Sequence, residues 1–280
     1  MIVVFGATGN IGAPLVSALL AKGAQVRAVT SDPAKVEALK ALGCEAIVAR
    51  FDDPATLEQA CAGAEKVFIV TPANQDMRKW RVNIFTAAKK AGVRHIVIIT
   101  GLGATPNSQL TFGIWHSESQ ELLKDSGMDW TLIQPTYFMK NLLWQADSIA
   151  NGIYLDDLGG PVSWVDARDI ADMAAEALTG AGHAGMAYGL TGGEALDGAA
   201  IAALLQKATG HAVTVQAVSA ADSHAAMVAG GMDTVTANAM IELSALAPKG
   251  YLAGIETTIE DVLGRPARSF VDFVAESFGP

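Results

Sequence analysis

The sequence is poor in cysteine, in charged residues and in clusters of basic residues. Its two cysteines, Cys44 and Cys61, match neither a metal-binding spacing nor a disulfide framework. Charged residues make up 17% of the 280-residue chain, whose net charge is −10. Because an acidic chain repels phosphate backbones and anionic lipids, we expect no nucleic acid and no membrane as partner. The cysteine spacing gives no sign of a metal site, and we expect no metal.

Long apolar runs are also missing. No run reaches the roughly 18 residues that a transmembrane helix needs, and the first apolar segment ends at Gly6, too early for a secretory signal. We therefore expect a cytoplasmic protein with reduced thiols. Hydrophobic residues are nevertheless plentiful, at 51%, which is enough for a large buried core in a monomer or homodimer.

The beginning of the chain holds the clearest motif. The β-branched and aromatic run at 2–5 is typical of a strand buried in a parallel sheet, and residues 11–20 repeat their apolar side chains with a helical period. Gly6, Gly9 and Gly12 lie in the turn between strand and helix. This order of strand, glycine turn and helix is the context in which such glycines indicate dinucleotide binding.

The glycines have a physical role in that interpretation. A pyrophosphate must lie almost against the backbone at a helix N-terminus, where unpaired N–H groups and the helix dipole attract anions. A Cβ at Gly6 or Gly9 would hold the pyrophosphate off, and Gly12 would let the helix approach the strand. The predicted phosphate-binding turn comprises Gly6, Thr8, Gly9, Asn10, Ile11 and Gly12.

Strand and helix patterns alternate up to residue 191. The predicted strands span residues 2–5, 25–30, 45–49, 66–70, 93–100, 130–134 and 187–191. Strands separated by helices predict an α/β fold with a doubly wound parallel sheet. We assign residues 1–135 and 162–191 to this dinucleotide-binding domain, and residues 136–161 and 192–280 to a smaller, mainly helical substrate-binding lobe.

Ligands of such sheets bind at the carboxyl ends of the strands. This rule adds Thr71, Pro72, Thr100 and Pro135 to the predicted cofactor site.

The end of the second strand is expected to face the adenine ribose, where an acidic side chain favours NAD(H) and a basic one favours the 2′-phosphate of NADP(H). Ser31 and Lys35 favour the phosphate, whereas Asp32 either favours NAD(H) or caps the next helix.

Five segments in a fixed order span nearly the whole chain, at 6–12, 87–97, 135–141, 165–171 and 264–270. Together they resemble the NmrA-like family, an atypical branch of the extended short-chain dehydrogenase/reductase superfamily. The resemblance implies a Rossmann domain with a small C-terminal lobe, binding NADP(H) or NAD(H). Similar members include a quinone oxidoreductase, a triphenylmethane-dye reductase and redox-sensing regulators.

Two positions depart from the family pattern. Ser31 stands where many members have an Arg for the 2′-phosphate, and Arg50 stands where many have an Asp near the adenine. Arg50 either stacks on the adenine, reaches a 2′-phosphate or lies in solvent, so the preference between NADP(H) and NAD(H) stays open.

The superfamily's usual proton donor, a Tyr-x-x-x-Lys pair, is missing from the sequence. The residues four positions after the four tyrosines are Asn141, Leu158, Gly192 and Ile255. The chain therefore lacks the pair used in ordinary carbonyl reduction. An extended conjugated acceptor needs mainly orientation and apolar walls, because the charge that it gains is delocalised.

The predicted substrate-binding residues are Trp115, Tyr137, Phe138, Trp144 and Trp164. His116 is the candidate acid, with the hydroxyls of Tyr137 and Thr100 as partners. These residues predict an NAD(P)H-dependent reductase of an aromatic or quinone-like small molecule. Two alternatives are a non-enzymatic NAD(P)-binding redox sensor and a dehydrogenase or isomerase of a hydroxylated metabolite, which would use His116 or Tyr137 as base.

Overall fold

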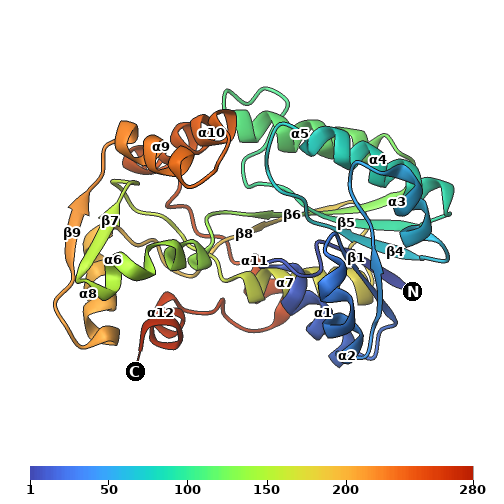
Figure 1. The fold of residues 1–280 in the computed structure, drawn as a ribbon, viewed down its shortest axis with the longest axis horizontal. Coiled ribbons are helices and arrows are strands. Elements are labelled where there is room, and N and C mark those ends of the chain that lie inside the picture. The colour runs from blue at the N-terminus through green and yellow to red at the C-terminus, as the bar shows by residue number, and fades with distance from the viewer. Residues whose placement is uncertain (280) are drawn as a thin grey trace. The chain divides into compact units, whose positions relative to one another are not determined.

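The computed structural model describes residues 1–279 and divides into two compact units (Figure 1). Unit 1 comprises residues 1–109, 113–134 and 167–189. Unit 2 comprises residues 110–112, 135–166 and 190–280. Each unit has its own hydrophobic core.

Unit 1 is built on a seven-stranded sheet with the strand order β3-β2-β1-β4-β5-β6-β8. The strands are β1 Ile2–Phe5, β2 Val26–Thr30, β3 Glu45–Val48, β4 Lys66–Ile69, β5 His95–Ile99, β6 Asp129–Pro135 and β8 Met186–Leu190. Every pairing from β3 to β6 is parallel. The predicted doubly wound parallel sheet is therefore confirmed, since helices lie on both of its faces (Figure 1).

Helix α3 (Pro54–Cys61) begins where the sequence supplies a start signal: Asp53 accepts a hydrogen bond from the Ala55 N–H at 3.1 Å, and Pro54 is the first helical residue. The helices are α1 Gly12–Ala21, η1 Pro33–Lys35, α2 Val36–Ala41, α3 Pro54–Cys61, α4 Met77–Lys90, α5 Thr111–Lys124 and α7 Ala167–Thr179. Helix α1 packs against α7, and α3 packs against α4.

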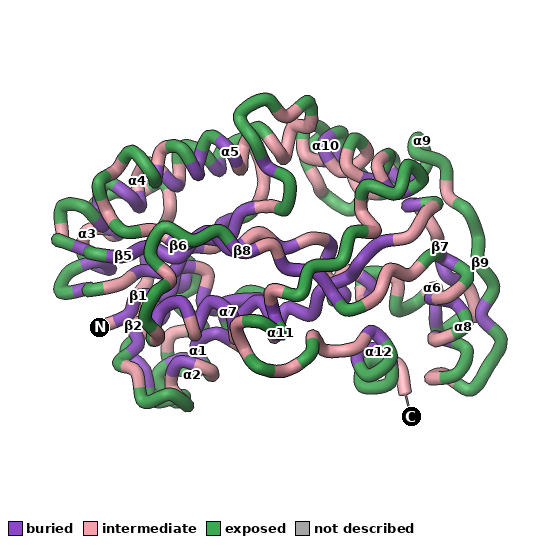
Figure 2. Tube along the Cα trace, turned by 180° about the vertical axis from the view of Figure 1, so that it is seen from behind, coloured by how far each residue is buried: buried purple, intermediate pink, exposed green. Residues whose placement is uncertain are grey.

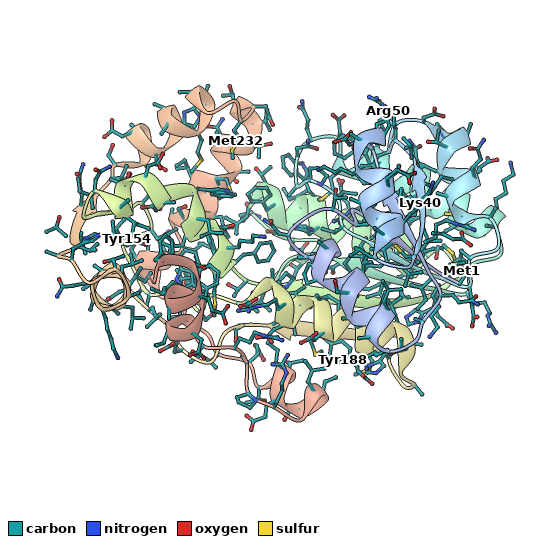
Figure 3. All side chains as sticks on the ribbon, turned by 60° about the horizontal axis from the view of Figure 1, so that its bottom comes forward. Met1, Lys40, Arg50, Tyr154, Tyr188 and Met232 are labelled. Atoms are coloured by element: carbon teal, nitrogen blue, oxygen red, sulfur yellow. The ribbon has the colours of Figure 1, made fainter. Side chains whose placement is uncertain are left out.

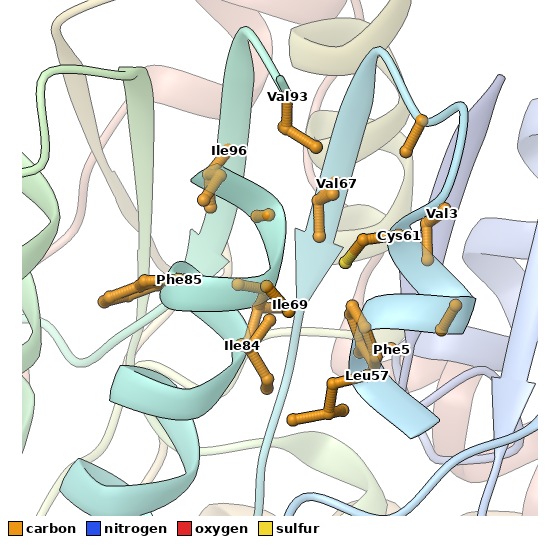
Figure 4. Packing of buried hydrophobic residues seen from close by; sticks show 14 of the residues in the cluster. Val3, Phe5, Leu57, Cys61, Val67, Ile69, Ile84, Phe85, Val93 and Ile96 are labelled. Carbon is orange, nitrogen blue, oxygen red and sulfur yellow. The ribbon is translucent and has the colours of Figure 1, made fainter. Parts of the chain in front are cut away.

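One core cluster of unit 1 lies between the sheet and the helices α3 and α4. Strand residues such as Phe5 and Ile69 pack there against Leu57, Cys61 and Ile84 from the helices (Figure 4). The central strands are buried while most of the connecting turns are exposed (Figure 2). The Cys61 thiol is fully buried, and burial raises its pKa to about 12.

Unit 2 is mainly helical and contains one small sheet, in which β7 and β9 pair in parallel. Its elements are η2 Met139–Gln145, α6 Ala146–Ala150, β7 Ile153–Asp156, α8 Gly198–Thr209, β9 Thr214–Ala217, α9 Ala220–Ala229, α10 Thr234–Ser244, η3 Ala247–Lys249, α11 Thr258–Leu263 and α12 Phe270–Phe278. Helix α12 packs against α8, and α9 packs against α10. None of the helices within residues 1–279 has both the length and the apolar character needed to cross a membrane.

The division differs from the expected domain bounds, because residues 110–112, 135, 162–166 and 190–191 belong to unit 2 and not to the dinucleotide-binding unit. For residues 162–166 the reason is backbone pairing: Val162 and Leu196 exchange N–H···O bonds of 3.0 Å, and the Ser163 N–H donates to the Leu252 carbonyl at 2.9 Å. The strand β7 was not predicted either, since four residues carry little periodicity.

Candidate functional site

In the turn between β1 and α1, backbone geometry alone explains why two of the three glycines are needed. Gly6 has φ +76°, and a Cβ there would lie 2.7 Å from the carbonyl oxygen of Val70. A Cβ on Gly12 would lie 2.1 Å from the carbonyl oxygen of Gly6, so only glycine lets the helix start this close to the turn. Both positions hold the shape of the turn.

Gly9 has a different environment. A Cβ there would approach only the Gly6 carbonyl oxygen, at 3.3 Å, so the space beyond Gly9 is open. The helix that follows has Ile11 at its N-cap position, no acid in its first turn and no capping side chain among the described residues. A helix N-terminus whose N–H groups lack a side-chain cap, next to an open backbone surface, fits the pyrophosphate of a dinucleotide.

The other predicted residues of the turn are placed consistently with that role. Thr8 and Asn10 are exposed beside Gly9. Ile11 is only 3% exposed, so it can contribute its backbone but not its side chain.

The ends of β2 and β3 lie side by side, because the Ala49 N–H donates to the Thr30 carbonyl at 3.0 Å. Ser31 and Lys35 are exposed there. Asp32 accepts a bond from the Ala34 N–H at 3.0 Å and so caps η1, as its alternative interpretation predicts. The Arg50 side chain is 66% exposed and lies 3.5 Å from the Asp52 carboxylate at the surface of the unit (Figure 3).

Thr71 and Thr100 follow the neighbouring strands β4 and β5. The paired register ends at Ile69 and Ile98, and Thr71 and Thr100 each lie two residues beyond that pair. Both threonines are buried, whereas Pro72, beside Thr71, is exposed. Adjacent parallel strands lie about 4.8 Å apart, so the two hydroxyls belong to one small area of the carboxyl edge.

Arg81 of α4 reaches this area and was not singled out from the sequence. It is 1% exposed; its Nε donates to the Thr71 hydroxyl at 3.3 Å, and its Nη2 donates to the Ile99 carbonyl at 2.8 Å. Its Nη1 is buried without a hydrogen-bond partner among residues 1–279. Burial lowers the pKa of the guanidinium to about 9. The only sequence signal is an Arg on the apolar stripe of a helix, four residues after the buried Met77.

Gln120 and His116 reach the same area from α5. The Gln120 Nε2 donates to the Thr100 hydroxyl at 3.1 Å. The His116 ring packs against Gly101, where an added Cβ would lie 3.1 Å from its Cδ2.

The His116 Nδ1 is buried and, within the described part of the chain, has no hydrogen-bond partner. Burial, reinforced by the charge of Arg81, lowers the pKa of His116 to about 3. The imidazole is therefore neutral near pH 7, which argues against the expected role of His116 as a general acid.

In unit 2, Tyr137 and Trp164 meet edge to face with ring centres 5.5 Å apart, and Trp164 packs against Phe270 at 6.0 Å. The Tyr137 hydroxyl lies 3.3 Å from the Ser244 hydroxyl, and burial raises the Tyr137 pKa to about 12. This is opposite to the lowered pKa that a proton-donating tyrosine needs. The two predicted substrate residues thus form part of the core of unit 2.

The other predicted substrate-binding residues, and Pro135 of the predicted cofactor site, do not belong to that core. Trp144 is 72% exposed, which argues against a role as the wall of an enclosed site. Phe138 is half-buried and forms a backbone bridge with Val165, and Trp115 is half-buried on α5. Pro135 is buried at the end of β6. Across residues 1–279 no three His, Cys, Asp or Glu side chains gather in a way that would hold a metal ion.

The chain is similar to known proteins over nearly its whole length. The chain is 44% identical over 284 residues to an NAD(P)H azoreductase of Xenophilus azovorans, covering 100% of this chain and 99% of the relative. It is 31% identical over 283 residues to quinone oxidoreductase 2 of Escherichia coli, covering 99% of each chain.

A solved structure of an NADPH-dependent quinone oxidoreductase from Escherichia coli, complexed with NADPH, superposes with a TM-score of 0.89 at 31% identity, and 100% of both chains is covered. Residues 6–181 match the family described as NAD(P)H-binding, which confirms the predicted cofactor class. The chain belongs to this NAD(P)H-binding family, within the NmrA-like, atypical short-chain dehydrogenases/reductases.

Proposed function

We propose that the protein is an NAD(P)H-dependent reductase that transfers a hydride to an aromatic or quinone-like small molecule. The observation that carries this proposal is the 44% identity, over the full length, to an NAD(P)H azoreductase. The identity of 31% to quinone oxidoreductase 2 supports the same reaction class with a different conjugated acceptor.

The residues of unit 1 fit the binding part of this reaction. The open backbone surface at Gly9 and the N-terminus of α1 would hold the pyrophosphate. The hydroxyls of Thr71 and Thr100, at the carboxyl ends of β4 and β5, would contact the reactive end. When bound, the reduced nicotinamide supplies the hydride.

The protonation states favour an acceptor that does not need an enzymatic proton donor. A quinone takes up one hydride and one proton to give the hydroquinone, and its ring delocalises the charge before the proton arrives. His116 is neutral near pH 7 and Tyr137 has a raised pKa, so we assign the proton to water. The same two pKa directions disfavour the alternative of a dehydrogenase or isomerase that uses either residue as base.

The test is an acceptor screen with the purified protein. The absorbance of NADPH or NADH should fall when a quinone, an azo dye or a triarylmethane dye is added. The Gly9→Asp variant is the control, because its carboxylate would repel the pyrophosphate and should abolish both binding and turnover. The proposal would be contradicted if the wild-type protein bound the cofactor but did not oxidise it in the presence of any acceptor in the screen.

A second candidate, a redox sensor that binds the cofactor without turnover, is favoured by the missing Tyr-x-x-x-Lys pair. It would be supported by a partner protein whose affinity depends on whether the reduced or the oxidised cofactor is bound. Steady turnover in the acceptor screen would count against it.

The setting of this activity completes the proposal. The acidic chain would act on small molecules in the cytoplasm, as a monomer or homodimer, without binding nucleic acid. Light scattering after size-exclusion chromatography would determine the oligomeric state.

A further inference from the structure

We infer that Arg81 and Gln120 are positioning residues, which set the hydroxyls of Thr71 and Thr100 as a pair of hydrogen-bond donors for one ligand oxygen. This inference rests on the proposed function, because the ligand oxygen belongs either to the carboxamide of the nicotinamide or to the conjugated acceptor. All four side chains belong to unit 1.

In both hydrogen bonds to the threonines, the threonine oxygen is the acceptor. A threonine hydroxyl has one proton to donate and two lone pairs to accept with. A guanidinium can only donate, so the 3.3 Å contact between Arg81 Nε and Thr71 Oγ1 makes the threonine oxygen the acceptor. The Gln120 Nε2 occupies the Thr100 oxygen in the same manner at 3.1 Å. Each contact leaves the hydroxyl proton available to a ligand at the carboxyl edge of the sheet.

Thr71 and Thr100 follow the carboxyl ends of the adjacent strands β4 and β5. Arg81 links these two ends, because its Nε donates to the Thr71 hydroxyl at 3.3 Å and its Nη2 donates to the carbonyl of Ile99, next to Thr100, at 2.8 Å. Two hydroxyl donors at adjacent strand ends match one ligand oxygen with at least two lone pairs, as a carbonyl or a phenolate oxygen has. The two donors are held from different helices, since Arg81 lies on α4 and Gln120 on α5.

The guanidinium of Arg81 is almost fully buried. No carboxylate lies within ion-pair distance of its guanidinium in residues 1–279, although the side chain is only 1% exposed. A buried cation without a counter-ion is costly, and an apolar side chain of similar size would pack at less cost. A positive charge behind the donor pair is useful where negative charge develops on a ligand oxygen, as it does when a conjugated acceptor takes up a hydride.

The unpartnered atoms are consistent with this arrangement. Arg81 Nη1 and His116 Nδ1 are both buried without a protein partner in the described chain. Burial, reinforced by the Arg81 charge, lowers the pKa of His116, so the ring stays neutral and adds no second cation to this area.

A double-mutant cycle tests the inference. Turnover, the KM for the acceptor, the Kd for NADPH and the unfolding temperature are measured for wild type, Thr71→Val, Thr71→Ser, Arg81→Met and the Arg81→Met/Thr71→Val double variant. We expect Thr71→Val and Arg81→Met each to lower either the affinity for NADPH or the ratio of turnover to acceptor KM by about tenfold, and Thr71→Ser to retain the wild-type values. The double variant should lose no more than either single variant, because Arg81 acts through the Thr71 hydroxyl.

The constant that changes by tenfold identifies the ligand oxygen that the two threonines contact. A raised Kd for NADPH assigns it to the carboxamide, and a fall in turnover over acceptor KM with unchanged Kd assigns it to the acceptor. Arg78→Met is the matched control, because Arg78 is an exposed arginine of the same helix, 3.5 Å from Glu118, and should have wild-type kinetics. If Arg81→Met does not fold, Gln120→Leu with Thr100→Val forms the same cycle.

Two results would overturn the inference: Thr71→Val and Thr100→Val with wild-type kinetics and cofactor affinity, or losses that add in the double variant. Failure of the proposed function would give a different result, since no acceptor would then support NADPH oxidation even by the wild-type protein. In that case the Kd for NADPH alone decides the inference, and an unchanged Kd in both valine variants would reject it.

Discussion

At the scale of the residue, burial moves the two titratable candidates away from neutral pH in opposite directions. The pKa of His116 falls to about 3, and that of Tyr137 rises to about 12. Neither side chain therefore exchanges a proton near pH 7. We therefore expect ligand selectivity in unit 1 to depend on hydrogen bonds at Thr71 and Thr100 and not on an acid or a base.

The neutral His116 predicts an acid-dependent loss of stability. As the pH falls from about 6.5 towards about 3, the unfolded chain binds a proton at this residue and the folded chain does not. The free energy of unfolding should therefore decrease with falling pH in this window. His116→Gln should flatten the decrease, as measured by urea unfolding at several pH values.

His95, whose pKa burial also lowers, contributes in the same direction, so the decisive quantity is the difference between the variant and wild type. His211→Gln, at an exposed position, is the control. Parallel stability curves for wild type and His116→Gln would contradict the prediction.

The choice of cofactor also belongs to single residues. Ser31 is exposed at the end of β2, where the adenine ribose is expected. Ser31→Arg should favour NADP(H) over NAD(H) by about tenfold, because a guanidinium forms charge-assisted bonds to a 2′-phosphate. Calorimetric titration with both cofactors measures the ratio, and Ser31→Ala is the control. An unchanged ratio would locate the discrimination elsewhere, for example at Arg50.

At the level of the element, the glycines of the turn differ in role: Gly6 and Gly12 allow its backbone conformation, and Gly9 leaves an open surface for the pyrophosphate. Gly12→Ala should lower the stability by more than about 1 kcal/mol, since its Cβ would lie 2.1 Å from a backbone carbonyl that cannot move freely. Gly193→Ala should change the stability little, because no atom lies within 4 Å of the added Cβ. Thermal unfolding compares the two. Equal stabilities would mean that α1 can shift to accept the methyl group.

The sequence could predict those features that depend on local pattern. The strands and the turn at Gly6–Gly12 follow from apolar periodicity and glycine spacing, both of which act over a few residues. Arg81 and Gln120 could not be predicted, because a polar residue on a helix is usually solvated and only the tertiary packing buries these two. Trp144 shows the reverse: an aromatic side chain expected in the site is exposed.

At the scale of the whole molecule, each of the two units has a separate core, and their sequence signals differ. Unit 1 has nearly continuous apolar strands such as β5, which pattern alone identifies. Unit 2 is held by an aromatic series from Tyr137 through Trp164 to Phe270, whose members are far apart in the sequence. The sequence therefore predicts the helical character of unit 2, whereas the pairing of these rings depends on tertiary packing.

Under the proposed function, the two buried thiols have a consequence, because quinones react with thiolates. Cys44 is 8% exposed and Cys61 is 0% exposed, and burial raises the pKa of both. Both thiols are thus buried and protonated, so the folded protein should resist covalent modification by a quinone.

Mass spectrometry after incubation with benzoquinone should find no adduct on the native protein and adducts on both cysteines after unfolding. Ser17→Cys, which places a thiol on the exposed face of α1, should gain one adduct in the native state. Modification of Cys44 or Cys61 in the folded protein would show that this protection fails. If the protection holds, the lifetime of the protein in the presence of electrophilic acceptors is limited by unfolding rather than by exposure to them.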